Sequence, residues 1–274
     1  MYINCNGRLL DLSSPKVMGI LNCTPDSFFD GGSYHNETEL LAQAGKMLAE
    51  GATIIDVGAY SSKPNAEFVS ETQELQRIVP VVELVLKHFP DTIISIDTFR
   101  SKVAEACIQA GAAIVNDISG GLLDENMLET VGKLRVPYIM MHMRGTPQTM
   151  VKLTDYGDIV HEMLLYFSRR IAEARKHGIN DIIIDPGFGF AKTLQQNYEV
   201  MNKLELFSIT GLPLLSGISR KSMIYKLLGT TPQEALNGTT VLNTVSLMKG
   251  AKILRVHDVK EAVEAARIYE AMLS

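Results

Sequence analysis

Cysteine is scarce in this chain. Cys5, Cys23 and Cys107 are odd in number, far apart and free of any CxxC spacing, which argues against a disulfide framework and a zinc site and fits a reducing cytoplasm. Long apolar runs are absent as well, since no stretch approaches about 18 uninterrupted apolar residues. The first residues also lack a basic start followed by an apolar stretch. We therefore expect a cytoplasmic protein that neither is secreted nor spans a membrane.

Excess positive charge is also missing. The 274 residues include 26 basic and 31 acidic side chains, a net charge of −5, so no basic stripe of the kind that nucleic acid requires is expected. An anionic substrate would need a local cluster of cations. The hydrophobic content of 46% suits one large core, and with no linker or shift in composition we expect a single domain over residues 1–274.

The short phosphate-binding motifs are incomplete. No GxxxxGK[ST] loop occurs, which excludes a P-loop. The segment DPGFGF holds the pair Gly187 and Gly189, but the third glycine of a dinucleotide fingerprint is missing. His88, His161 and His177 are expected on helix surfaces, and Met140 to Met143, the run MMHM, in the core or a pocket wall rather than at a metal.

Eight short β-rich runs are present, and segments with helical spacing separate most of them. The runs are nearly continuous in apolar residues, as expected of parallel strands covered on both faces; they lie at 17–22, 53–58, 92–98, 112–117, 137–142, 181–187, 213–219 and 252–257. Between them, glycines follow several helical segments, at Gly51, Gly111, Gly178 and Gly250, while Ser70, with Gln73, and Ser101 resemble N-caps. This alternation predicts a (β/α)₈ TIM barrel with eight parallel strands and the site at its C-terminal rim; a doubly wound open sheet is the alternative.

Polar residues cluster where the predicted strands end. The barrel would bring these ends to one rim, with Asn22, Asp56, Ser61, Ser62, Asp97, Asn116, Asp117, His142, Asp185, Ser216 to Lys221, Arg255 and His257 on it. Any one of them could simply tie down loop backbone. Together, however, Asp97, Asn116 and Asp185 offer the groups that suit an aminopyrimidine edge.

Two cationic segments lie on the same predicted rim. In GISRKS, Arg220 and Lys221 stand where a helix begins, a position that favours anions, although a surface arginine at a solvated helix start is the simpler interpretation of Arg220. In RVH, Arg255 and His257 share one side of a strand and could hold a phosphate. An ion pair with Asp258 or Glu261 is the alternative.

With these residues assembled, the chain resembles the dihydropteroate synthase family. GILNCTPDSFFDGG, IIDVGAYSSKP, SIDTFRS, VNDISGG, IIIDPGFGFAK and LLSGISRKS are similar to its motifs, in the same order, from about Lys16 to the last helix. Several long motifs in order are far more specific than a short pattern. The resemblance implies a TIM barrel that joins p-aminobenzoate to 6-hydroxymethyl-7,8-dihydropterin diphosphate in folate synthesis, usually as a homodimer packed through helices near the C-terminal end.

The resemblance also implies roles for individual residues. Catalysis would rest on Asp97, Lys221, Arg255 and His257, and the pterin pocket on Asp97, Asn116, Met140, Asp185, Gly217, Lys221 and Arg255. For p-aminobenzoate, and for sulfonamides as competitive inhibitors, the residues are Phe28, Ser61, Ser62, Lys63, Pro64, Phe190 and Ser222. Pyrophosphate would meet Asn22, Ser62, Lys63, Arg255 and His257, with magnesium as the cofactor at Asn22. One departure lies in the second loop, where Lys63 and Asn65 replace the family's usual Arg and Gly.

Two other functions compete with this interpretation. One is a methyltetrahydrofolate-binding barrel that passes a methyl group to a corrinoid partner, which would need neither a pyrophosphate cluster nor the SRKS helix start. The other is a pterin-binding protein without activity, whose mark would be loss of Asn22, Asp97 or Lys221, and all three are present. Release of pyrophosphate on mixing both substrates with magnesium discriminates among the three.

Overall fold

A computed structural model of the chain describes residues 1–23, 34–60 and 69–273. Its main element is a sheet of eight parallel strands, in the order β8-β7-β6-β5-β4-β3-β10-β9. A parallel bridge between Ile184 and Leu214 joins the two ends of this order, so the sheet forms a barrel. The strands are β3 (Lys16–Asn22), β4 (Ile54–Gly58), β5 (Ile93–Asp97), β6 (Ile114–Asp117), β7 (Tyr138–Met141), β8 (Ile182–Asp185), β9 (Leu215–Ser216) and β10 (Ile253–Val256). Each predicted strand is present, and the barrel rather than the open sheet is confirmed.

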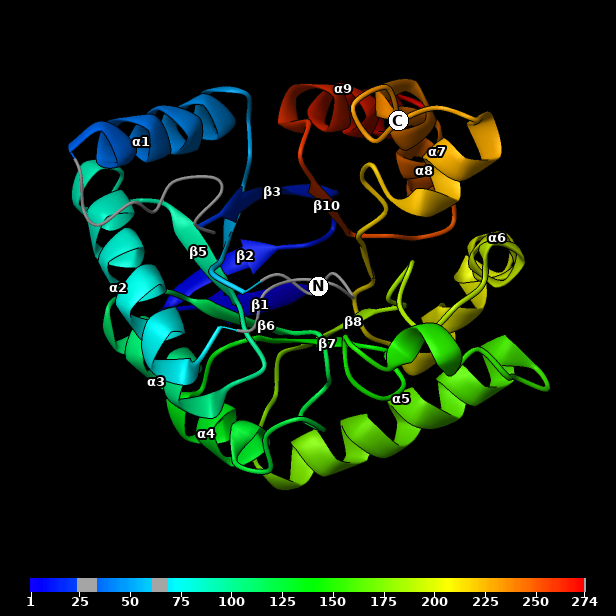
Figure 1. Cartoon of the computed structure of the whole chain (residues 1–274), viewed down its shortest axis with the longest axis horizontal. Helices are drawn as coiled ribbons and strands as arrows, with labels where there is room; N and C mark the ends of the chain where they lie inside the picture. The colour runs from blue at the N-terminus through cyan, green and yellow to red at the C-terminus, as the bar shows by residue number, and fades with distance from the viewer. Residues whose placement is uncertain (24–33, 61–68, 274) are drawn as a thin grey trace.

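Helices surround the barrel as a ring (Figure 1). They are α1 (Tyr34–Ala49), α2 (Glu71–His88), α3 (Ser101–Gln109), α4 (Met127–Leu134), α5 (Ile159–Lys176), α6 (Leu194–Asn202), α7 (Ser222–Leu228), α8 (Leu236–Met248) and α9 (Val259–Ala271), with 3₁₀ turns η1 (Met150–Lys152) and η2 (Leu204–Thr210). The four glycines predicted to follow helices all have positive φ, as a helix C-terminus favours.

Local capping differs between two of the predicted helix starts. Ser70 caps α2 through a capping box with Gln73, as predicted. Ser101, by contrast, is the first residue of α3, the cap position is Arg100 and no side chain caps it. The amide of Ser101 instead donates to Asp124 Oδ2 at 2.7 Å. A carboxylate from a later loop therefore accepts a hydrogen bond from the start of α3, in place of the serine hydroxyl that was expected to cap it.

An antiparallel hairpin closes the N-terminal end of the barrel. It consists of β1 (Tyr2–Cys5) and β2 (Arg8–Asp11) and lies across the centre of the ring in Figure 1. Its buried residues pack on the first inward-facing residue of the barrel strands; this cluster comprises Ile3, Cys5, Leu10, Leu12, Met18, Ile54, Ile93, Ala113, Ile114, Ile139, Ile183, Leu215 and Ile253. The barrel is thus sealed at this end and can receive a ligand only at the opposite, C-terminal end.

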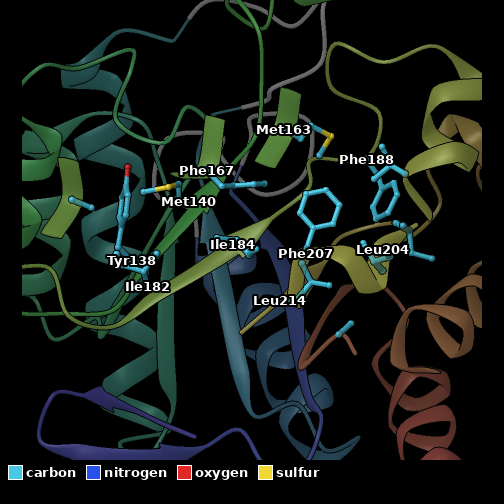
Figure 2. Close-up of a cluster of buried hydrophobic side chains, with 14 of the residues drawn as sticks. Tyr138, Met140, Met163, Phe167, Ile182, Ile184, Phe188, Leu204, Phe207 and Leu214 are labelled. Carbon is cyan, nitrogen blue, oxygen red and sulfur yellow. The ribbon is translucent and has the colours of Figure 1, made fainter. Parts of the chain in front are cut away.

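The remaining core lies between the strands and the ring of helices. Figure 2 shows part of it, where Tyr138, Met140 and Ile184 meet Phe167 and Phe207 from the surrounding helices. Phe167 and Phe207 pack edge to face with centroids 5.9 Å apart, a favourable aromatic arrangement. Within the described part of the chain, no helix is long and apolar enough to cross a membrane.

Candidate active site

The inward-facing positions of the strands change from apolar to polar within two residues. Because side chains alternate between the faces of a strand, the residue two positions after the apolar layer also points into the barrel. This second layer contains Ile20, Asp56, Ser95, Asn116, Met141, Asp185, Gly217 and Arg255. The nearly continuous apolar runs of β4, β5, β6, β8 and β10 therefore conceal one polar inward position each, and those positions meet above the sealed end of the barrel.

A guanidinium of this layer bridges two carboxylates, Asp56 in the same layer and Asp97, the next inward-facing residue of β5. Arg255 Nε donates to Asp56 Oδ2 and Nη2 donates to Asp97 Oδ2, both at 2.6 Å. Asn116 Nδ2 donates to the same Asp56 oxygen at 3.1 Å. β10, β4, β5 and β6 thereby share one charged network. Arg255 makes neither of the ion pairs considered from the sequence, because Asp258 pairs with Arg220 at 2.7 Å.

The protonation of Asp97 is poised near neutrality. Burial raises the pKa of the Asp97 carboxyl to about 7, and the negative charge of Asp56 adds to the rise, while the Arg255 guanidinium opposes it. A carboxyl group held in this balance can become charged or neutral at small cost, as groups at functional sites often do. Asp97 is therefore suited to respond to a ligand that brings positive charge.

A second acid–base pair lies on the opposite side of the barrel. Asp185 is buried, and its Oδ1 accepts from the Gly187 amide at 2.7 Å. Burial raises the pKa of Asp185, and Lys221 opposes the rise. Burial also lowers the pKa of Lys221 to about 8. The Lys221 ammonium donates to the Phe188 carbonyl and stands 4.7 Å from the centre of the Phe190 ring.

Gly217 leaves space in this part of the layer because it has no side chain. A Cβ atom at Gly217 would approach Asp185 Oδ2 at 3.7 Å and Arg255 Cβ at 3.9 Å, so Gly217 lies between the two charged side chains. Any larger side chain would occupy the space above them. The carboxylate of Asp185 and the guanidinium of Arg255 therefore border a common space at the mouth of the barrel.

His257 lies at the end of β10, on the face of Arg255. The residue is exposed at the rim, its Nδ1 lies 3.0 Å from Ser219 Oγ in a partly buried contact, and its backbone amide donates to the same oxygen at 3.1 Å. Partial desolvation, followed by the Arg255 charge, lowers the pKa of His257 to about 4. The imidazole is therefore neutral at pH 7, with Nε2 left for a ligand.

The strand register corrects the placement of Met140. Met140 has no exposed surface and belongs to the cluster between strands and helices, as Figure 2 shows. Asp185 is registered with Met141 on the neighbouring strand, so Met141 shares the inward face of Asp185. A shift of one residue along a strand reverses the face, and within MMHM the sequence offers no way to choose. We therefore assign the barrel-facing wall to Met141.

Two polar residues of the expected rim have structural partners instead. Asp117 points outward, where it accepts from the Tyr138 hydroxyl and from Ser119 and Gly121. His142 is buried and contacts Lys192.

The remaining predicted site residues lie partly within and partly outside the described residues. Asn22 is exposed at the end of β3, Phe190 and Ser222 are partly buried near Lys221, and Phe28, Ser61, Ser62, Lys63 and Pro64 lie outside the described residues.

The structure adds Ser95, which was not predicted, and brings Asp56, which was expected on the rim without an assigned role, into the polar layer. Asp56 Oδ1 and Ser95 Oγ are buried in the polar layer with no hydrogen-bond partner among the described residues, and the two residues are registered with each other on β4 and β5. Buried polar atoms usually have partners, so these two are candidates for contact with a bound molecule or water. The sequence signal was a single polar residue inside an apolar run, as in TIISID.

A pre-formed metal centre is not evident in the part of the chain that the structure describes, where no group of three His, Cys, Asp or Glu residues could hold an ion. Magnesium often binds through one or two protein oxygens together with substrate phosphates. The exposed amide of Asn22 at the mouth of the barrel fits this mode. The donor set therefore suits a magnesium ion that arrives with a diphosphate.

Sequence comparison finds relatives that match this protein along its whole chain. The profile of the pterin binding enzyme family matches residues 18–257. Dihydropteroate synthase of Escherichia coli K12 is 45% identical over 276 residues, which cover 100% of this chain and 97% of the relative. The enzyme of Haemophilus influenzae is 42% identical over 273 residues, 99% of this chain and 98% of the relative.

Solved structures agree with these relatives. A crystal structure of Yersinia pestis dihydropteroate synthase with a sulfonamide drug has a TM-score of 0.93 at 43% identity, over 100% of this chain and 99% of that one. The Xanthomonas albilineans enzyme with 4-aminobenzoic acid has a TM-score of 0.92 at 36% identity, over 100% and 98%. Both similarities extend across the barrel and its polar layer.

Proposed function

The chain belongs to the dihydropteroate synthase family of pterin binding enzymes, and we propose that its polar barrel layer holds the pterin diphosphate while p-aminobenzoate attacks from the rim. The enzyme is a transferase of folate synthesis. It joins p-aminobenzoate to 6-hydroxymethyl-7,8-dihydropterin diphosphate, giving 7,8-dihydropteroate and pyrophosphate. The observation that carries the proposal is the charged layer of Asp56, Asp97, Asp185, Lys221 and Arg255 above a sealed barrel end.

Pterin recognition follows from the acceptors in the layer. The aminopyrimidine edge presents neighbouring N–H donors, and a carboxylate can accept two of them in parallel. Asp185 keeps Oδ2 free of the Gly187 amide, which bonds Oδ1, and Asn116 adds both a donor and an acceptor. Lys221 provides a nearby cation that favours the ionised form of Asp185.

Departure of pyrophosphate is the step that needs most help, because an arylamine is a weak nucleophile. Arg255 and His257 at the end of β10 would hold the diphosphate oxygens and stabilise the negative charge that develops there. Magnesium, when bound with Asn22, would neutralise further charge on the same group. We assign no general base, since an arylamine at neutral pH has a free lone pair.

Asp97 serves the other end of the breaking bond. The electron-rich dihydropterin can carry positive charge at its exocyclic carbon as pyrophosphate leaves. An ionised Asp97 would stabilise that charge, and its pKa of about 7 makes ionisation accessible. Positioning of the amine by Phe190, Ser222 and the loop residues from Phe28 and Ser61 to Pro64 then supplies much of the remaining rate.

The reaction itself is the first test. Purified protein mixed with p-aminobenzoate, the pterin diphosphate and magnesium should release pyrophosphate and form dihydropteroate in equal amounts, and omission of either substrate should stop both. Sulfonamides should raise the KM for p-aminobenzoate without changing kcat. A protein that binds pterin but releases no pyrophosphate would contradict the assignment and favour the non-catalytic alternative.

Replacement of His257 separates the anion site from the pterin site. We expect His257→Ala to weaken binding of pyrophosphate and of the pterin diphosphate about tenfold, near 1.4 kcal/mol, because one neutral hydrogen-bond partner is lost. Pteroate carries no phosphate, so its affinity should change less than about twofold. Calorimetry on the three ligands checks this, with His161→Ala on α5 as a control; equal losses for pteroate and pyrophosphate would mean that His257 shapes the pocket.

We also propose a homodimer in the cytoplasm, with residues 1–274 as one domain. Leu228 on α7 and Val241 on α8 are 54% and 53% exposed, and large apolar side chains on adjacent helices favour a protein partner. The three cysteines are free and buried, which suits a reducing compartment. Light scattering should give a dimer mass for the wild type and a monomer mass for Leu228→Glu with Val241→Glu; a wild-type monomer would contradict the dimer.

A further inference from the structure

The turn after β8 brings several groups to the site in a left-handed backbone conformation. Gly187, Gly189 and Ala191 have φ values of 67°, 82° and 47°, in the left-handed region that side chains disfavour. A Cβ atom at Gly187 would collide with the carbonyl oxygen of His142. The turn thus passes so close to the end of β7 that only glycine fits at position 187.

This turn supplies much of the second-substrate side of the site. The Phe188 carbonyl accepts from the Lys221 ammonium, and the Phe190 ring lies beside that ammonium. Asp185 directly precedes the turn and is bonded to the Gly187 amide. A displacement of the turn would therefore move Lys221 and Phe190 together.

Lys192 braces the turn from inside. Its side chain is buried, with 8% of the residue exposed, and Nζ donates to the carbonyls of Gly187 at 2.9 Å and Phe190 at 3.0 Å. The third contact is to His142 Nδ1 at 3.1 Å. An ammonium has three N–H donors, and all three have acceptors here. Two of these hydrogen bonds connect the ends of the turn, and the third connects the turn to His142, which follows β7.

His142 is suited to accept this hydrogen bond. It is 2% exposed, and burial, followed by the charges of Lys192 and Arg144, lowers its pKa well below the ordinary value. A neutral imidazole can accept at Nδ1, whereas a protonated one cannot. Two further contacts hold the turn, because Asn197 accepts from the Gly189 amide at 2.6 Å and Tyr156 donates to the Ala191 carbonyl at 3.0 Å.

A lysine at this position is costly to stability. Burial lowers the pKa of Lys192 to about 7, so the folded state resists its charge, and an apolar side chain of similar length would often be neutral or better for stability. The Lys192 ammonium contacts His142 and the backbone carbonyls of the turn. It makes no hydrogen bond to a side chain that we propose to meet substrate. Its retention in the core therefore points to a role in geometry.

We propose that Lys192, with His142 as its anchor, is a positioning residue that holds the 187–190 turn so that Phe190 and Lys221 face p-aminobenzoate. The inference rests on the proposed function. Because Asp185 precedes the turn and keeps its place at the end of β8, loss of the brace should affect p-aminobenzoate more than the pterin.

The test compares Lys192→Met with Lys192→Gln. Methionine matches the length without a donor, and we expect the KM for p-aminobenzoate to rise about tenfold. The Kd of the pterin diphosphate should stay within about twofold, and amide exchange should speed in residues 187–191 but not in β5. Glutamine keeps an N–H₂ group and should recover part of the loss. Lys203→Met, at a half-buried surface lysine paired with Glu199, is the matched control.

Each outcome decides a different question. A wild-type KM in Lys192→Met, with or without a lower melting temperature, would overturn the proposal and leave Lys192 as a structural residue. Equal losses for both substrates would also overturn it. If Lys192→Met does not fold, the same split is sought in Lys192→Gln, where a smaller rise in the KM alone supports the brace and an unchanged KM rejects it. Wild-type protein that forms no dihydropteroate would instead refute the proposed function.

Discussion

Asp185→Asn is expected to abolish measurable binding of the pterin diphosphate while the barrel stays folded. Oδ2 of Asp185 faces the space beside Gly217, and the change places either an N–H₂ group or a neutral oxygen opposite the N–H donors of the aminopyrimidine. The loss of a charge-assisted bidentate contact costs about 2–4 kcal/mol. Calorimetry with the pterin diphosphate measures the change.

The fold should tolerate this substitution because ionisation of the buried Asp185 carboxyl already destabilises the folded state. Burial raises its pKa above the unfolded value, so ionisation of Asp185 reduces stability as pH rises toward neutrality. A neutral asparagine can still accept from the Gly187 amide, and we expect a melting temperature within a few degrees of the wild type. Asp91→Asn, in an exposed loop, is the control. Unchanged pterin affinity in folded Asp185→Asn would remove Asp185 from the site.

The barrel was predictable because each strand and its rim residue are local signals. A short apolar run ending in Asp or Asn specifies both a buried parallel strand and the polar group at its end. Asp97 and Asp185 follow this rule, as the last residues of β5 and β8. The strand order then follows from right-handed β/α connections.

The inward faces of the strands were harder to assign. A strand buried on both sides has no alternation of apolar and polar residues, so Met140 and Met141 look equivalent in the sequence. Only the register with Asp185 separates them. The N-terminal hairpin was missed for a related reason, since Tyr2–Cys5 and Arg8–Asp11 are short strands whose partner surface, the sealed barrel end, appears only in the fold.

The Arg255 bridge could not be predicted because its partners are 199 and 158 residues away. The sequence placed Arg255 and Asp97 on the same rim but offered neighbours such as Asp258 as equally good partners. Distance along the chain carries no information about pairing across a closed barrel. The pairing determines how the site is charged, because one guanidinium offsets two buried carboxylates.

Arg255→Met should therefore give the largest combined loss of stability and activity. Breaking a buried ion pair by removal of one partner typically costs about 3–5 kcal/mol, and Asp56 has no exposed surface with which to recover solvation. Loss of the cation proposed to meet pyrophosphate should lower kcat by at least about a hundredfold. Urea unfolding and steady-state kinetics measure the two effects, and Arg255→Lys keeps the charge without the planar fork that spans Asp56 and Asp97.

The stability loss should depend on pH in a direction set by Asp97. Its folded pKa of about 7 lies above the ordinary 3.8, so its ionisation weakens the fold between about pH 4 and pH 7. Removal of the Arg255 charge, which lowers that pKa, extends the weakening above pH 7. The gap in unfolding free energy between wild type and Arg255→Met should therefore be smaller near pH 5, where Asp97 is protonated in both folded proteins and only the lost contact with Asp56 contributes, and should widen toward pH 8. For Arg255→Lys the widening should be smaller, because the ammonium still opposes the rise. A gap that stays constant from pH 5 to pH 8 would show that the charge of Arg255 does not stabilise ionised Asp97 and would contradict the proposed bridge between the two carboxylates.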